Sequence, residues 1–380
     1  MITRALIAFL LCISLGKAQA APVVVGAVVT ETGMQAPLAA GYRKALVLWQ
    51  EEVNAGGGLL GRPVELRLLD DGSQAVRSRE LYAKLVGEKA DLLIGPYGTA
   101  ATLLALAEAE RARRVMVNGA APARAVLKRS PRYVFQVAAP YAAYATGIVE
   151  LAQAAGCRGL FISVREELAA LEVAQGAREL ALARGLTVDG PEPYAGGTTD
   201  FSAVAGKARA YGAELWLAFG ETRDVVELMR TSLEQGYAPP VFFTDAATQP
   251  RFLEAAGHWA DQVLGTVGYD ARLAFGSNRE FVKAFRARWA AAPDRAAAEG
   301  YAAATVLAAG VRRAGTLESQ KLRAALAALE VDTVLGTYKV NPANGEQVGI
   351  RPAVVQFVKG RTEVVWPPQI RTAEARIACR

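Results

Sequence analysis

Histidine is almost absent from this 380-residue chain, which has His258 as its one example. Its three cysteines form no Cys-x-x-Cys pair and no His-x-x-x-His spacing occurs, so the usual ligand sets of zinc are missing. A Ser–His–acid triad would depend on His258, and neither a Gly-x-Ser-x-Gly elbow nor a phosphate-binding loop is present. We therefore expect no enzyme, no cofactor and no metal. An enzyme that uses only carboxylates stays open, although no spacing singles out a pair.

Long apolar runs are lacking after the N-terminus, where residues 1–20 have the features of a secretory signal. Arg4 gives a short positive region, residues 5–15 an apolar core, and Ala18-Gln-Ala20 a cleavage site. The apolar run is too short to span a bilayer. We predict cleavage after Ala20 and export of a soluble chain to the periplasm.

The mature chain has little net charge and few thiols. Removal of Arg4 and Lys17 leaves 41 basic and 37 acidic residues, a balance of +4 that is too small and dispersed to indicate nucleic acid. The basic tail, residues 371–380, is expected to be solvated and poorly ordered. Cys157 and Cys379 remain after cleavage, and the sequence leaves open whether they form a disulfide or stay separate thiols.

Short apolar runs alternate with longer helical patterns, which is typical of parallel α/β domains. The first series has predicted strands at 23–29, 64–69, 92–94, 115–117 and 134–137, with helices at 37–54, 74–88 and 99–111. The second has helices at 141–155, 168–184, 201–211 and 223–235, with strands at 159–164, 186–188, 215–219 and 241–243. Two such series predict two doubly wound lobes. Three further helical patterns (278–290, 294–313, 317–329) and two strands (354–358, 364–366) follow.

One glycine-rich stretch runs through Gly56, Gly58 and Gly61, in the spacing of a dinucleotide-binding fingerprint. That fingerprint needs a strand before it and a helix after it. Here apolar residues at helical spacing precede the glycines, and alternating apolar residues follow them. The stretch is therefore predicted to end a helix and turn the chain into a strand, without a nucleotide.

The same stretch, Asn54-Ala-x-Gly-Gly-x-x-Gly-Arg-x-Val-Glu-Leu66 with Asp70-Asp-x-Ser73, resembles the first helix-to-strand connection of type I periplasmic binding proteins. The branch it resembles binds branched-chain amino acids for ABC importers. Further matches keep the family's order over roughly residues 23–366: Ile94-Gly-Pro96, Met116-Val-Asn-Gly-Ala120, Tyr133-Val-Phe135, Thr198-Thr-Asp-Phe-Ser202 and Val334-Leu-Gly-Thr-Tyr338.

The resemblance implies two doubly wound parallel-sheet lobes joined by a hinge of three crossings. Lobe 1 would comprise residues 21–138 and 268–335, and lobe 2 residues 139–267 and 336–370. The crossings would fall near residues 138–140, 266–270 and 335–338. The helices of residues 278–329 would then complete lobe 1 rather than form a third domain.

Two predicted loops of lobe 1 follow strands and open helices. Thr99 is placed to cap the helix at 99–111, and Pro122 suits the first turn of another helix. From the residues alone these are ordinary caps. The resemblance implies that Thr99, Ala100, Ala120 and Ala121 hold a ligand carboxylate through a hydroxyl and backbone amides. Ala100 departs from the family, which often has a serine there.

In lobe 2 the resemblance implies an acid that pairs with an α-ammonium, at Asp245 or, comparably, at Glu221. Tyr269 matches an aromatic that covers the ligand, and Tyr141 and Tyr144 are further lining candidates. A position that is often aromatic in the family is Ala169 here. Each of these residues could also be a solvated or core residue. In lobe 1 the loop 30–33 ends the first strand and would also line the cleft.

The resulting hypothesis is a monomeric solute-binding component of an ABC importer. It would close over a small amino acid or a related acid or amide and present it to the membrane permease subunits. The alternative is a sensory module of the same fold that acts on a regulatory partner. The sequence does not name the solute.

Overall fold

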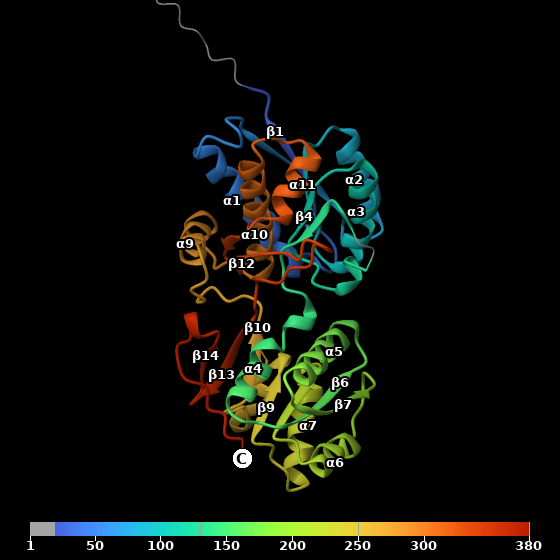
Figure 1. Ribbon diagram of the computed structural model, residues 1–380, viewed down its shortest axis with the longest axis vertical. Coiled ribbons are helices and arrows are strands. Elements are labelled where there is room, and N and C mark those ends of the chain that lie inside the picture. The colour runs from blue at the N-terminus through green and yellow to red at the C-terminus, as the bar shows by residue number, and fades with distance from the viewer. Residues whose placement is uncertain (1–19, 129–130, 250, 380) are drawn as a thin grey trace, which may run out of the picture.

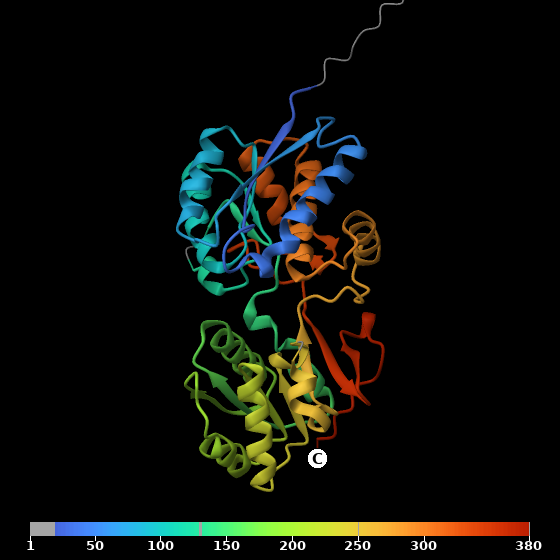
Figure 2. The same ribbon diagram turned by 180° about the vertical axis from the view of Figure 1, so that it is seen from behind.

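A computed structural model describes residues 20–128, 131–249 and 251–379. The predicted signal therefore lies outside the described residues except for Ala20. Two α/β lobes lie end to end and are joined by a few connecting segments (Figure 1, Figure 2). Within the described ranges, no helix is both long and apolar enough to cross a membrane.

The first lobe is built on a five-stranded parallel sheet with the order β2-β1-β3-β4-β5. Its strands are β1 (Val23–Val29), β2 (Val64–Asp70), β3 (Leu92–Ile94), β4 (Met116–Asn118) and β5 (Val134–Gln136). Both faces of such a sheet are covered by helices, so β1 is buried along its whole length and is a continuous run of small apolar residues. All five strands agree with the sequence prediction to within about one residue.

Six helices belong with this sheet: α1 (Ala36–Ala55), α2 (Arg77–Gly87), α3 (Thr99–Ala112), α9 (Asn278–Trp289), α10 (Arg295–Ala314) and α11 (Ser319–Ala327). The helix α10 packs along α1 and against β3 and β4, while α11 packs on α10 and α9 on α1. The late helices therefore complete the first lobe and form no domain of their own (Figure 1).

The second lobe holds a seven-stranded sheet with the order β14-β13-β10-β9-β8-β6-β7. Its parallel strands are β6 (Gly159–Arg165), β7 (Thr187–Tyr194), β8 (Leu215–Phe219), β9 (Val241–Thr244) and β10 (Leu264–Val267), and β13 (Ala353–Val358) and β14 (Arg361–Trp366) are antiparallel. Its helices are α4 (Thr146–Ala154), α5 (Leu168–Ala183), α6 (Ser202–Tyr211), α7 (Thr222–Glu234) and α8 (Phe252–Ala256). The sequence prediction missed β10, and its strand at 186–188 covers only the first two residues of β7.

The third crossing differs from the expectation. Residues 335–338 do not cross, because β12 (Gly336–Tyr338) pairs with β11 (Val331–Thr333) in a small antiparallel sheet. The Tyr338 hydroxyl donates to the carbonyl oxygen of Leu326 in α11, which keeps the hairpin on the first lobe. The buried amide of Gln347 then donates to the carbonyl of Val137, beside the first crossing. The chain therefore enters the second lobe only between Gln347 and β13.

The glycine-rich connection has the predicted form, a helix end followed by a strand. Gly57 and Gly58 have φ of +91° and +80°, a backbone conformation that favours glycine. The Asn54 side chain accepts from the Val64 amide at 2.7 Å and donates to the Val64 carbonyl at 2.9 Å. Arg62 donates to the carbonyls of Ala21 and Pro22. The side chains of Asn54 and Arg62 therefore hold the helix, the strand and the N-terminal segment together.

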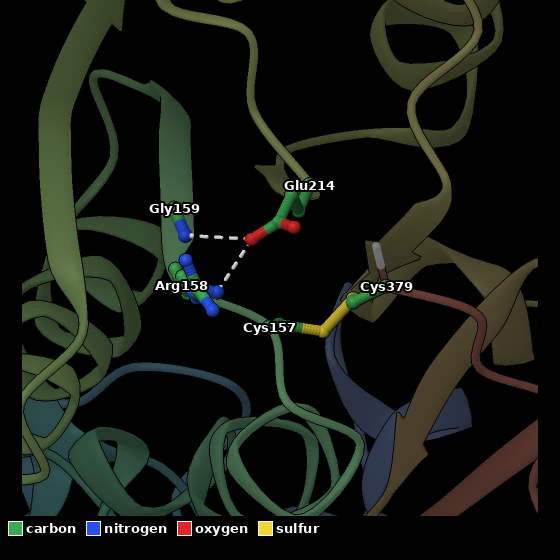
Figure 3. Close-up of a disulfide and its surroundings, with 5 residues drawn as sticks. All are labelled: Cys157, Arg158, Gly159, Glu214 and Cys379. Carbon is green, nitrogen blue, oxygen red and sulfur yellow. Dashed lines mark hydrogen bonds between the residues drawn. A yellow bond between two sulfur atoms is a disulfide. The ribbon is translucent and has the colours of Figure 1, made fainter.

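The C-terminal tail contradicts the expectation of poor order, although residues 371–379 remain exposed or half-buried as expected of a solvated segment. Residues 371–379 lie along the second lobe, where Gln356 donates to the Arg376 carbonyl at 2.9 Å and accepts from the Arg376 amide at 2.8 Å. Cys379 is disulfide-bonded to Cys157, which lies two residues before the start of β6 (Figure 3). Of the two readings that the sequence left open, the structure has the disulfide.

Replacing both Cys157 and Cys379 with serine should release the tail from the second lobe. Loss of a native disulfide costs about 2–4 kcal/mol, and here much of the loss should fall on residues 371–379. We expect faster amide exchange of this segment and a lower melting temperature, measured by hydrogen–deuterium exchange and calorimetry. Wild-type protein treated with a reductant is the matched comparison. Unchanged exchange of the tail in both samples would show that the hydrogen bonds of Gln356 alone hold it.

Candidate functional site

A cavity of about 670 Å³ lies where the crossings meet the open end of the second sheet. The crossings contribute Tyr141, Tyr144 and residues 268–270, the second lobe contributes Asp245, and α10 of the first lobe contributes Arg295. Carboxyl ends of parallel strands are the usual ligand sites of open α/β sheets. The cavity is therefore the best candidate site, and both lobes contribute to it.

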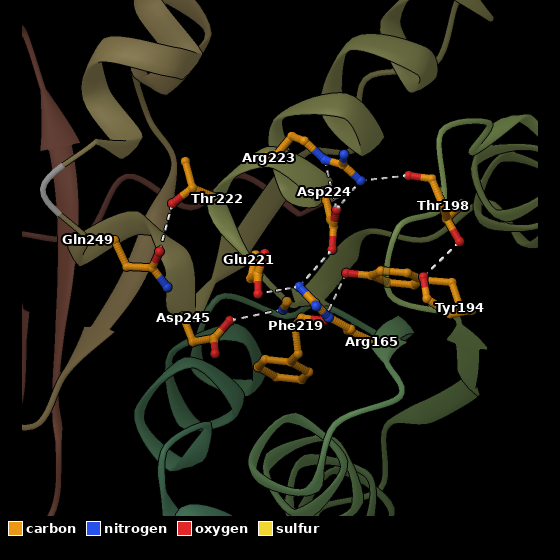
Figure 4. A network of polar contacts seen from close by, with 12 residues as sticks. Arg165, Tyr194, Thr198, Phe219, Glu221, Thr222, Arg223, Asp224, Asp245 and Gln249 are labelled. Carbon is orange, nitrogen blue, oxygen red and sulfur yellow. Dashed lines mark hydrogen bonds and ion pairs between the residues drawn. The ribbon is translucent and has the colours of Figure 1, made fainter. Parts of the chain in front are cut away.

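Asp245 is the acid of this cavity. It begins a short 3-10 turn, Asp245–Thr248, directly after β9, and accepts a long hydrogen bond of 3.4 Å from the Gly220 amide (Figure 4). Burial raises the pKa of Asp245 to about 7, against the lowering effect of backbone hydrogen bonds, and the nearby charge of Glu167 adds to the rise. No cationic side chain within the described residues pairs with it. A bound cation would therefore stabilise its ionised form.

Glu221 has a different environment. It caps α7 by position and pairs with Arg165 at 2.6 Å, while its side chain is 63% exposed. The same guanidinium reaches the buried Asp224 at 3.4 Å, and the Tyr194 hydroxyl donates to the Phe219 carbonyl beside it (Figure 4). Glu221 is not part of the cavity wall. Its carboxylate already has a partner in Arg165.

The aromatic candidates do reach the cavity. Tyr141, Tyr144 and Tyr269 all line it, and Ala169 lies in its wall beside Val173. The hydroxyl of Tyr269 donates to Asn278 Oδ1 at 3.0 Å, so this ring is fixed at the second crossing. Its hydroxyl is thus used within the protein, while the ring remains available for packing against a solute.

The lobe 1 loops do not form part of the cavity wall. Gly98, not Thr99, is the N-cap of α3, and no side chain caps this helix, so the predicted capping by Thr99 is wrong. Thr99 is half-buried and Ala100 is exposed, whereas Ala120 and Ala121 are buried. Pro122 precedes a 3-10 turn, Arg124–Val126, where a helix was predicted. Contact of these loops with a ligand therefore stays a prediction.

The loop after β1 is held by the Asp-Asp-x-Ser motif at the end of β2. Asp70 accepts hydrogen bonds from the Glu31 amide at 2.9 Å and the Thr32 hydroxyl at 2.6 Å. Desolvation opposes ionisation, but these bonds and one from Gly72 lower the pKa of Asp70 to about 2. The motif therefore fixes two neighbouring strand-end loops of lobe 1 and is not left free for a ligand.

Arg295 is a cavity residue that the sequence prediction missed. It is the first residue of α10 and lies with Asp245 and Tyr141 in the cavity wall. The available signal was electrostatic, because an arginine at the start of a helix opposes the helix dipole and is an unusual choice there. Tyr97 lies nearby, in the loop after β3. Burial raises the pKa of Tyr97, and the positive charge of Arg295 opposes this rise.

Two α/β lobes, three crossings and a cavity at the crossings define a two-lobed solute-binding protein. The sequence model of the periplasmic binding protein family matches residues 22–362, so the chain belongs to the periplasmic binding proteins. Proteins of this family bind solutes for transport and are not enzymes.

Similar proteins agree with this assignment. An "Amino acid binding protein" of Pseudomonas aeruginosa is 26% identical over 334 residues, which cover 83% of this chain and 85% of that protein. A putative branched-chain amino acid ABC transporter structure from Silicibacter pomeroyi superimposes with a TM-score of 0.81 at 18% identity, covering 94% of this chain and 99% of that chain. A solute-binding protein from R. palustris in complex with benzoate has a TM-score of 0.65 at 22% identity, covering 94% and 99%.

Proposed function

We propose that this chain is the periplasmic solute-binding component of an ABC importer. It captures a small amino acid, or a related carboxylate or amide, and delivers it to the permease subunits. The observation that carries the proposal is the cavity, since its wall combines both lobes with the crossings and holds an acid without a cationic partner. The names of the P. aeruginosa and S. pomeroyi relatives support an amino acid, and the R. palustris relative supports an aromatic acid.

Binding and closure are coupled in this proposal. A solute that contacts both lobes favours the closed arrangement by its extra contacts there, and a few kcal/mol suffices to shift the equilibrium. Desolvation of the apolar part of the solute and charge-assisted hydrogen bonds at its polar end provide the affinity. The closed pair of lobes then presents a joint surface to the permease.

A thermal-shift screen of amino acids, amides and small aromatic acids tests the function. A ligand that binds only the folded protein raises the melting temperature by mass action. At a ligand concentration of about a hundred times Kd, the free energy of unfolding increases by about 2.7 kcal/mol. We expect one chemical class to stabilise the protein, with calorimetry giving one site per chain. If no member of the three classes stabilises it, the proposed solute range is wrong.

Replacing Thr99 with valine tests the lobe 1 loop. The change keeps the side-chain shape and removes a hydroxyl that bonds to no other group in the described part of the chain. If this hydroxyl contacts a charged head group in the closed protein, affinity should fall by about 1–2 kcal/mol. Calorimetry with the ligand from the screen measures the affinity of wild type and variant. Because Thr99 caps nothing, an unchanged affinity would leave no role for its hydroxyl.

A further inference from the structure

We propose that Arg295 is the carboxylate-binding residue of this cavity, and that the solute is an acid with an apolar body. The inference rests on the proposed function and deepens it, because it names the group on which recognition depends. Position 100, where a serine hydroxyl was expected, is alanine and lies outside the cavity wall, whereas Arg295 lies within it. Arg295 can therefore supply the contact to a carboxylate that a serine at position 100 would make.

The position of Arg295 is fixed by the helix that carries it. Asp294 caps α10 by accepting from the Ala297 amide at 2.7 Å. On α1, Gly41 makes room for this carboxylate, since a Cβ there would lie 2.0 Å from Asp294 Oδ1. The first turn of α10 is therefore clamped against α1, and Arg295 needs no rearrangement of the backbone to meet a solute.

The guanidinium of Arg295 is also oriented from within α10. Its Nε donates to Glu299 Oε1 at 2.8 Å, and Glu299 is 4% exposed. The two terminal amino groups make no hydrogen bond within the described ranges, and the side chain is 44% exposed at the cavity. A guanidinium held at Nε offers its remaining N–H groups in the planar arrangement that matches a carboxylate.

Two phenols add hydrogen-bond donors for an anion. Tyr141 lines the cavity and Tyr97 lies nearby, and neither hydroxyl has a partner in the part of the chain that the structure describes. Both are donors that a carboxylate can use. Asp294 already caps the N-terminus of α10 and Glu299 already pairs with Nε of Arg295, so recognition of a carboxylate would depend on the free N–H groups of Arg295 and on these phenols.

The rest of the cavity wall indicates what the acid carries. Apolar side chains of the second lobe and the second crossing make up much of it: Val173, Leu253, Val267, Leu273 and Phe357. They suit a branched aliphatic or aromatic body. An α-ammonium on that body would be placed by Asp245, and an acid without an amine would leave Asp245 protonated.

The test uses matched acids and amides as probes: L-leucine with L-leucinamide, 3-methylbutanoate with its amide, and benzoate with benzamide. Calorimetry should show that an acid of this set binds and that its amide binds about 30-fold more weakly, the scale of two charge-assisted hydrogen bonds. In Arg295→Gln the affinity for the acid should fall by a similar factor, while the affinity for the amide should change little. Arg295→Lys should keep part of the affinity. The control is Arg313→Gln, the same change on the exposed last turn of α10, with wild-type binding expected.

The loss of discrimination between acid and amide is the decisive readout, because a merely structural defect would weaken both. Equal binding of acid and amide by wild-type protein would overturn the inference, as would an Arg295→Gln variant that still prefers the acid. If only neutral compounds of the thermal-shift screen bind, the proposed function stands and the role of Arg295 falls. If nothing in the screen binds, the proposed function itself is contradicted.

Discussion

Asp245→Asn should weaken binding of an amino acid about a hundredfold or more. The α-ammonium of such a solute would pair with Asp245 in a cavity that closure makes poor in water, and removing one partner of a buried pair costs about 3–5 kcal/mol. The structure supports this magnitude, because no cationic side chain in the described part of the chain pairs with the Asp245 carboxyl. The ammonium group of the solute would therefore be its only cationic partner there. Calorimetry on wild type and variant measures the ratio.

The pH dependence of the same measurement tells the solute classes apart. With a pKa of about 7 in the free protein, Asp245 is mostly protonated at pH 5 and must lose its proton to pair with an ammonium. Affinity for an amino acid should then rise about tenfold per pH unit between pH 5 and 7 and level off above. A neutral amide should show no such rise. An acid without an amine should bind best below pH 7, where Asp245 carries no charge to repel it.

Asp189→Asn is the matched control for Asp245→Asn, because Asp189 lies exposed on the edge strand β7, away from the cavity. It should leave both affinity and pH profile unchanged. The proposed ammonium site would be contradicted if a tight-binding amino acid bound equally well to wild type and to Asp245→Asn, and if its affinity did not change from pH 5 to 7. Glu221 would then be the next acid to test, at the cost of its pair with Arg165.

Most elements of the fold could be predicted because their apolar patterns are strong and local. The strands missed or cut short lack that signal. β10 has four residues, one of them Gly265, and β7 contains Pro191 and Pro193. Proline cannot donate to a sheet ladder, so its presence argues against a strand, but β7 is an edge strand and tolerates it. The β11–β12 hairpin depends on packing against α11, which no local pattern reveals.

The residues of the candidate site also differ in how far the sequence could identify them. The family resemblance implied Asp245, which directly follows a buried strand, and the structure places it in the cavity wall. Arg295 could not be predicted, because it meets Tyr97 and Tyr141 only after the chain has run through the second lobe and returned. The tail was misjudged for a related reason. Its charge is typical of a solvated segment, while its order comes from Gln356 and Cys157, which lie far away in the sequence.

A second large effect is expected from a substitution where α10 packs against the first lobe's sheet. Gly119, in the loop after β4, lies against the first turns of α10. A Cβ at this position would lie 2.3 Å from the carbonyl oxygen of Glu299 and 3.1 Å from Cβ of Ala303. Both are in a packed helix, and neither is the movable end of a long side chain. An alanine here must therefore push α10 away from the sheet.

Gly119→Ala should lower the free energy of unfolding by about 1–3 kcal/mol, the range of overpacked cores. It should also weaken binding of an acidic solute, because Arg295 and Glu299 begin the displaced helix. Gly87→Ala is the control, since α2 ends there and a Cβ meets no atom within 4 Å. That change should be neutral or stabilising by up to about 1 kcal/mol, because alanine favours helix over glycine. Urea unfolding of both variants gives the comparison. A Gly119→Ala protein as stable as Gly87→Ala would mean that α10 does not pack closely on this glycine and that the fold does not fix the position of Arg295.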